Sequence, residues 1–198
     1  MSAIRVLPVL LLAALPGVGR AEPLAPSLDE AAATMRPGQY RWDVAAGADG
    51  PLAIGVSLAM QRLYVYRGGT VVGVAAVSTG KPGHRTPAGD YTILGKARWH
   101  RSNLYSNAPM PWMQRLSNDG IALHAGVNPG RPASHGCIRL PPAFARDLFA
   151  LTAVGEPVTV ADWPPHAPVT LAIEWPDGAA SMPEPAPLPY DPAALSDS

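Results

Sequence analysis

The sequence lacks several features by which classes of protein are recognised. Its 198 residues include a single cysteine, so no disulfide can close within the chain. Fifteen basic and fifteen acidic residues give a formal net charge of +0, and nothing in this balance points to a nucleic-acid partner. The longest apolar run, residues 6–18, is shorter than the roughly 20 residues that cross a bilayer. No internal repeat is present.

The N-terminal 21 residues are typical of an export signal. Arg5 precedes the apolar run, and small residues surround Arg20, just before the first acidic residue, Glu22. We therefore predict a cleaved signal peptide at 1–21, with an uncleaved anchor as the alternative, and location in the periplasm or cell envelope. No cysteine lies directly after the run, so we expect no lipid-modified N-terminus. Cleavage would leave 13 basic and 15 acidic residues and no membrane span.

The rest of the chain divides into three parts. Residues 22–50 are expected to form an N-terminal arm with a short helix over 27–35, because Ser27 and Glu30 have the spacing of a capping box. Residues 51–162 carry a hydrophobic pattern of the size expected of one domain. Residues 163–198 contain nine prolines and are predicted to be a partly disordered extension.

Most of the predicted elements in the central domain are strands. Alternating apolar residues predict a half-buried strand over 52–58, and a Gly68-Gly69 turn predicts a hairpin of 63–66 with 71–77. Further strands are expected at 90–94, 121–124 and 156–160. One helix is predicted to begin at the prolines 141–142 and to stop near Gly155, with Phe144, Leu148 and Leu151 on one face. The predicted fold class is mainly β with one principal helix.

The single cysteine, Cys137, lies in a setting that favours chemistry. A nearby imidazole can hold a thiol as the reactive thiolate, and His124 ends the strand thirteen residues upstream. Gly136 leaves the sulfur accessible, and the Gly136 and Cys137 amides could stabilise an oxyanion. An isolated cysteine is more often a small core residue. Here the proline-rich flanks indicate an exposed loop, so we favour acyl transfer over core packing.

These residues resemble the L,D-transpeptidase catalytic domain family (YkuD-like) of bacterial cell-wall enzymes. That family has an upstream histidine and a Ser/Thr-His-Gly-Cys motif, matched by His124 and by the run Ser134-His135-Gly136-Cys137-Ile138-Arg139. Runs at 61–66, 77–80 and 85–91 extend the resemblance over about 51–162. It implies a YkuD-like β-sandwich or mixed-sheet domain. Only nine residues separate His124 from Ser134, fewer than is common in the family, which implies a more open groove.

The resemblance implies a role for each residue of the motif. Cys137 would attack a peptidoglycan stem peptide after an L-configured centre, release the terminal D-amino acid and form a thioester. His124 would act as general base, oriented by a backbone carbonyl near Ala125. Ser134 and His135 are expected to support the loop.

Other residues near the motif have two possible roles each. Arg139 could bind a substrate carboxylate or serve as a structural salt-bridge partner. Tyr105, Met110 and Trp112 lie in an irregular segment, 99–112, that could cover the substrate as a lid or simply pack against the domain.

Several alternatives remain open at this point. The same fold could hydrolyse peptidoglycan peptides as an L,D-carboxypeptidase or amidase, or could bind the cell wall without catalysis. A sortase-like transpeptidase fits less well, because the Thr-Leu-x-Thr-Cys pattern is absent. A zinc site of His124, His135 and Cys137 is a weak possibility, since no second closely spaced ligand pair is present. We expect no metal or cofactor and peptidoglycan stem peptides as partners; the sequence leaves the oligomeric state open.

Overall fold

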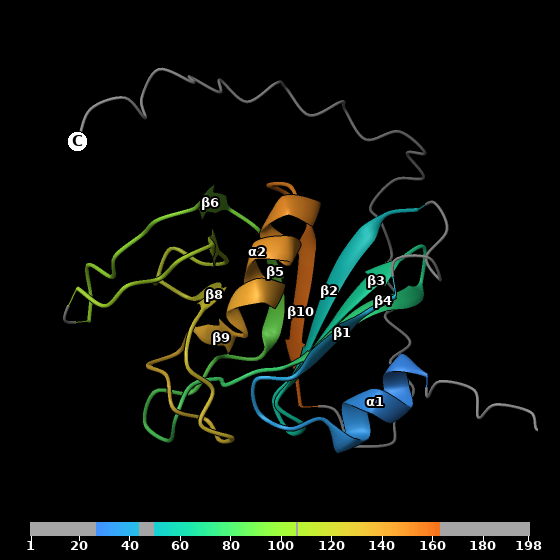
Figure 1. The fold of residues 1–198 in the computed structure, drawn as a ribbon. Helices are drawn as coiled ribbons and strands as arrows, with labels where there is room; N and C mark the ends of the chain where they lie inside the picture. Colours follow the sequence, from blue (N-terminus) through green and yellow to red (C-terminus); the bar gives the residue numbers. More distant parts are fainter. Residues whose placement is uncertain (1–26, 44–49, 106, 163–198) are drawn as a thin grey trace, which may run out of the picture.

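The computed structural model describes residues 27–43, 50–105 and 107–162. The elements in chain order are α1 (Leu28–Thr34), β1 (Tyr40–Trp42), β2 (Leu52–Ser57), β3 (Arg62–Arg67), β4 (Thr70–Ala76), β5 (Gly89–Thr92), β6 (Gly95–Ala97), β7 (Met113–Arg115), β8 (Ala122–Ala125), β9 (Ile138–Leu140), α2 (Pro142–Leu151) and β10 (Pro157–Ala161). Figure 1 shows α2 beside the strands. The prediction of a mainly β fold with one principal helix, α2, is confirmed.

The strands form two sheets. The larger has the order β1-β4-β3-β2-β10-β5, and the smaller has the order β6-β7-β8-β9. Neighbours are antiparallel except β10 with β2 and β8 with β9, which are parallel. The predicted hairpin is confirmed as β3 and β4, with Gly68 and Gly69 at φ +55° and +84° in the turn.

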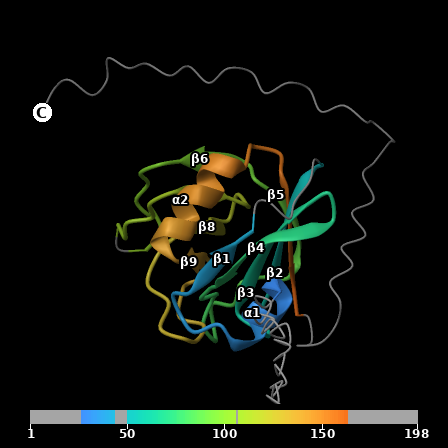
Figure 2. The ribbon, with the colours of Figure 1, turned by 45° about the vertical axis from the view of Figure 1, so that its right-hand side comes forward.

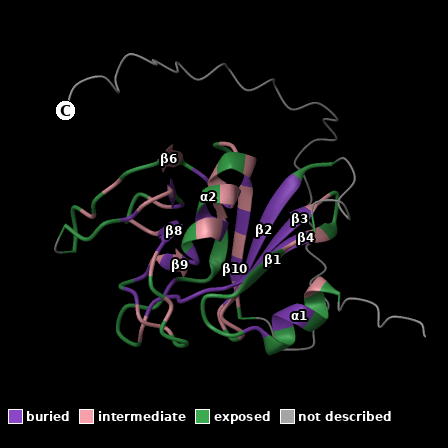
Figure 3. Ribbon diagram, in the orientation of Figure 1, coloured by how far each residue is buried: buried purple, intermediate pink, exposed green. Residues whose placement is uncertain are grey.

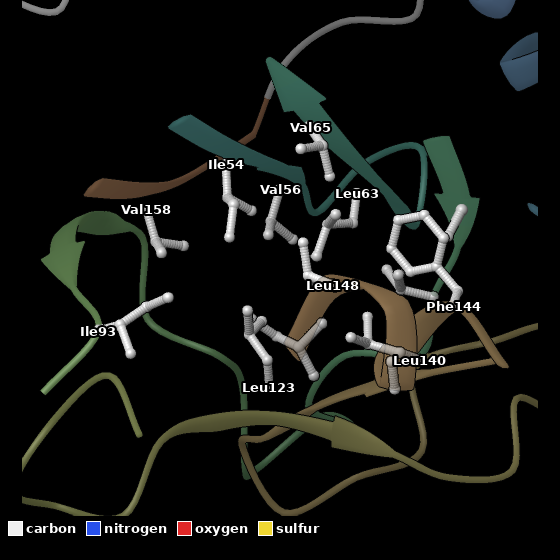
Figure 4. Packing of buried hydrophobic residues seen from close by; sticks show 14 of the residues in the cluster. Ile54, Val56, Leu63, Val65, Ile93, Leu123, Leu140, Phe144, Leu148 and Val158 are labelled. Atoms are coloured by element: carbon white, nitrogen blue, oxygen red, sulfur yellow. The ribbon is translucent and has the colours of Figure 1, made fainter. Parts of the chain in front are cut away.

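The main core lies between the two sheets and includes one face of α2. Figure 4 shows side chains of β2, β3, β8 and α2 pointing toward one another. Phe144 and Leu148 of α2 are fully buried, as the predicted helix face requires. Gly155 does not stop the helix. The helix ends at Leu151 because Thr152 is extended, donates its hydroxyl to Leu148 O and accepts the Lys96 ammonium at its carbonyl oxygen.

Strand β2, near the middle of the larger sheet, is buried on both faces, which corrects the prediction of a half-buried strand at 52–58. Every residue of β2 is buried (Figure 3). On the second face, Ala53 and Tyr64 belong to a buried cluster that also includes Ala32 of α1. The predicted capping box is confirmed: Ser27 Oγ accepts the Glu30 amide at 3.3 Å, and Glu30 Oε2 accepts the Ser27 amide at 2.9 Å.

Two predicted segments, the signal peptide at 1–21 and the extension at 163–198, lie outside the described residues. Within the described ranges, no helix has both the length and the apolar character needed to span a membrane.

Candidate active site

The loop before β9 is held by hydroxyl groups. Ser134 Oγ donates to the Cys137 carbonyl oxygen at 2.5 Å and accepts the Gly136 amide at 3.0 Å. Thr86 Oγ1 donates to the Gly136 carbonyl oxygen at 2.7 Å and accepts the Gly80 amide at 2.9 Å. Both side chains are buried, and the two bonds of Thr86 tie the cysteine loop to the segment that follows β4. Ser134 therefore supports the loop.

Gly136 has a conformation that few other residues could adopt. Its φ is +121°, and a Cβ atom here would lie 2.9 Å from Ile121 Cδ1. The sequence predicted that the Gly136 amide contributes to an oxyanion site. In the structure that amide donates to Ser134 Oγ, so it serves the loop. The Cys137 amide is the remaining candidate donor for an oxyanion.

The Cys137 sulfur is half-buried beside the segment that leads into β8. It donates to the Gly120 carbonyl oxygen at 3.3 Å. Burial raises the pKa of the Cys137 thiol, while a hydrogen bond from the Ala122 backbone and the charge of Arg139 act in the opposite direction. Because burial is the largest effect, the resting sulfur is a neutral thiol and requires a base for reaction.

His124 has the properties of such a base. It lies on β8, is 8% exposed, and its Nδ1 is 2.8 Å from the Ala125 carbonyl oxygen, as predicted. A carbonyl only accepts, so Nδ1 carries the hydrogen and Nε2 has the free lone pair. Burial lowers the pKa of His124; the Ala125 bond raises it, and Arg139 and His100 lower it further. The ring is therefore neutral at neutral pH.

His124 and Cys137 line one cavity of about 860 Å³. In the parallel pairing of β8 with β9, His124 is opposite Arg139, which also lines the cavity. The other lining residues are Gly38, Trp99, Ser102, Tyr105, Ala108, Pro109, Met110, Pro111, Trp112, Ala125, Gly126, Val127, Asn128, Ser134, His135, Pro141 and Pro142. None of these described lining residues is acidic, so the cavity suits an anionic ligand.

A family model of the L,D-transpeptidase catalytic domain (YkuD) matches residues 51–160. The chain belongs to this family. A comparison with curated proteins finds no match. The match covers the His124 and Cys137 positions but begins after α1 and β1.

Solved structures of L,D-transpeptidases share the fold. The enzyme from Stackebrandtia nassauensis is 28% identical, with a TM-score of 0.53 over 58% of this chain and 57% of its own. LdtMt1, solved in complex with imipenem, is 28% identical, with a TM-score of 0.52 over 56% and 58%. One from Mycobacterium tuberculosis H37Rv is 24% identical, with a TM-score of 0.52 over 56% and 57%, which shows the fold alone. The chain thus spans just over half the length of these proteins.

Among the described residues that line the cavity, Arg139 is the only lysine or arginine. Its guanidinium is therefore the group that could bind an anion there. Among the described residues, no carboxylate forms an ion pair with it. The structure therefore gives no support to the alternative in which Arg139 is a structural salt-bridge partner.

The aromatic residues predicted near the site have two different environments. Tyr105 is 40% exposed and stacks on His135, with ring centroids 4.6 Å apart. Trp112 lines the cavity but is also packed, 5.6 Å from Phe149 and with the Arg98 guanidinium 5.0 Å over its ring. Met110 lines the cavity and is buried. The segment 99–112 thus forms one wall of the cavity.

Zinc binding by His124, His135 and Cys137 would need all three side chains at one point. Within the described residues, no group of three histidine, cysteine or acidic side chains is arranged to hold a metal ion. His135 is instead exposed and in contact with Tyr105 and His84.

Sequence reasoning missed three contributors to the site. Thr86 lies in a run that resembles the family, but nothing in the sequence shows that its hydroxyl reaches the Gly136 carbonyl oxygen. The Gly120 carbonyl oxygen accepts the hydrogen bond of the Cys137 thiol. Gly38, in the N-terminal arm, lines the cavity, although no motif marks it.

Proposed function

We propose that this protein is an exported cysteine L,D-transpeptidase that acts on peptidoglycan stem peptides through a thioester on Cys137. The observation that supports this most is that a neutral, oriented imidazole, His124, lines the same cavity as the Cys137 thiol and Arg139. Membership of the L,D-transpeptidase family is consistent with this chemistry.

The first half of the proposed reaction acylates the cysteine. His124 Nε2 takes the proton of the Cys137 thiol, and the sulfur attacks the carbonyl that follows an L-configured centre. The Cys137 amide stabilises the oxyanion. The C–N bond then breaks, and His124 returns the proton to the amine of the leaving D-amino acid. Arg139 binds the carboxylate of that residue through its planar guanidinium.

The second half transfers the acyl group. An amine of a second peptide attacks the thioester carbonyl, His124 accepts the amine proton, and the C–S bond breaks. The proton then returns to the sulfur, which regenerates the thiol. If water attacks instead, the same steps give a carboxylic acid, and the protein is a carboxypeptidase.

The directions in which the pKa values of Cys137 and His124 are shifted predict that the proton stays on the thiol until substrate binds. Burial raises the pKa of Cys137 and lowers that of His124, so the neutral pair is favoured over a thiolate and an imidazolium in the empty cavity. A neutral thiol is also oxidised less readily than a thiolate. The negative charge that develops on the substrate carbonyl oxygen, next to the Cys137 amide, favours the protonated form of His124 and therefore the reaction.

Product analysis tests the proposed activity. Purified protein is incubated with tetrapeptide-containing muropeptides, and the products are separated and identified by mass spectrometry. We expect release of the terminal D-amino acid and a cross-linked dimer. Cys137→Ala should give neither while retaining the circular dichroism of the wild type. Equal turnover by Cys137→Ala would refute the mechanism.

Export is a separate part of the proposal, based on the composition of residues 1–21. Cell fractionation with N-terminal sequencing should find the protein in the envelope fraction with Glu22 at or near its first position. Full-length protein confined to the cytoplasm would refute export without affecting the chemistry.

A further inference from the structure

A turn outside the matched catalytic domain contributes to the wall of the catalytic cavity. It joins α1 to β1 (Figure 1 and Figure 2), and its Gly38 lines the cavity. The Gln39 amide donates to the Arg36 carbonyl oxygen at 3.0 Å, Pro37 is second in the turn, and Gly38 is third with φ +81°. These are the features of a type II turn, which requires a residue such as glycine at the third position.

The turn is fixed on three sides. Arg62 Nε and Nη2 donate to the carbonyl oxygens of Ala32 and Met35, at 2.7 and 2.6 Å. The Ala76 amide donates to the Gln39 carbonyl oxygen at 3.0 Å. Pro37 packs against the loop after β8, because a Cβ on Gly130 would lie 3.0 Å from Pro37 Cγ. The wall is therefore a fixed part of the fold.

The turn is also the boundary of a second cavity, of about 500 Å³. Gly38 lines both cavities, and the second is otherwise lined by Ala31, Thr34, Met35, Gln39, Tyr40 and Arg41. None of these described residues is acidic. Arg41 is exposed and forms no ion pair or side-chain hydrogen bond with another described residue. Its guanidinium is therefore available for a carboxylate, which it can bind through two parallel bonds.

We propose that the second cavity is the subsite for the acceptor peptide, with Arg41 bound to a carboxylate of that peptide and its amine directed across Gly38 to the thioester. This inference rests on the proposed function, which requires two peptides at one cysteine. A cavity of 860 Å³ lies within the range of about 300–1,000 Å³ that holds one drug-sized molecule. We therefore assign the donor to this cavity and the acceptor to the second cavity, because the two share Gly38 as a lining residue.

The test compares two acceptors with one donor. The donor is a tetrapeptide muropeptide, and the acceptors are a short peptide with a free amine and C-terminal carboxylate, and the same peptide as its C-terminal amide. The readout is the ratio of amine transfer to hydrolysis. Arg41→Gln should lower this ratio about tenfold for the carboxylate acceptor, the size expected for loss of a charged hydrogen bond, and less than about twofold for the amide. Arg146→Gln removes a cation that lines neither cavity and should change neither ratio.

A second pair of variants tests the passage across Gly38. Asparagine tolerates positive φ better than most residues, so Gly38→Asn places a side chain at the boundary with little disturbance of the turn. Gly69→Asn is the matched control, because Gly69 has φ +84° and, like Gly38, no atom within 4 Å of an added Cβ, but lines neither cavity. Gly38→Asn should lower transfer to both acceptors relative to Gly69→Asn.

The outcomes separate the two proposals. If wild-type Cys137 forms no adduct with the donor, the proposed function fails and the subsite fails with it. If the adduct forms and is transferred to amines but Arg41→Gln and Arg146→Gln give the same ratios, the subsite alone is overturned. If the adduct forms but water is the only acceptor, the subsite is overturned together with the transfer half of the proposed function, and a carboxypeptidase remains. Arg41 is exposed, so its variant is expected to remain folded even if Gly38→Asn is not.

Discussion

The Thr86 hydroxyl provides a sharp test of how the cysteine loop is held. Thr86 is 3% exposed, and its Oγ1 bonds both the Gly80 amide and the Gly136 carbonyl oxygen. Thr86→Val keeps the shape of the side chain but leaves both backbone groups without this partner. A buried polar group without a partner costs about 1–3 kcal/mol, so we expect a loss of at least about 2 kcal/mol in the free energy of unfolding.

Thr86→Ser is the matched variant. It keeps the hydroxyl and removes one methyl group, which costs about 1 kcal/mol. Urea unfolding of the two proteins measures the difference. Acylation of Cys137 should fall at least tenfold further in Thr86→Val than in Thr86→Ser, because the loop loses its bond to Gly136. Equal unfolding midpoints and equal acylation rates for the two variants would refute the role assigned to the hydroxyl.

Three other predictions follow from the site. The acid limb of the pH–rate profile for acylation should have its midpoint below pH 6.5, because burial lowers the pKa of His124 and keeps the base neutral there; a midpoint at or above 6.5 contradicts this. His124→Gln should slow iodoacetamide alkylation of Cys137 at neutral pH, and an unchanged rate would show that His124 does not activate the sulfur. Arg139→Gln should raise the KM for a stem tetrapeptide about tenfold but leave the KM for its C-terminal amide unchanged. Equal effects on both substrates would show that Arg139 does not bind the substrate carboxylate.

Local chemistry made much of the fold predictable. The hairpin of β3 and β4 follows from two glycines between apolar runs, and the start of α1 follows from the reciprocal bonds of Ser27 and Glu30. The alternation of β2 was misleading. On its second face, Ala53 is buried in a cluster that includes Ala32 of α1, and Arg62 holds α1 through two carbonyl oxygens of residues 27 or more positions earlier in the chain.

The part of the candidate site that could be predicted from the sequence is the Ser134-to-Cys137 motif and the upstream His124. Cys137 and His124 were predicted as catalytic residues from residue type, spacing and the family resemblance, and both line the cavity. The partner of the Gly136 amide was not predictable, because it depends on the backbone angle at Gly136 and the rotamer of Ser134. Gly38 and Arg41 could not be assigned either, since their positions beside the cavities result from tertiary packing of an arm with no motif.

The most direct test of the central claim is intact-protein mass spectrometry after brief exposure to a tetrapeptide muropeptide. We predict a mass increase equal to the mass of the donor minus the mass of the free D-amino acid that it releases, because the thiol proton leaves with the amine of that amino acid. Peptide mapping should locate the adduct on Cys137, and Cys137→Ser should lack the thioester. Unmodified Cys137 together with unchanged muropeptides would contradict the claim.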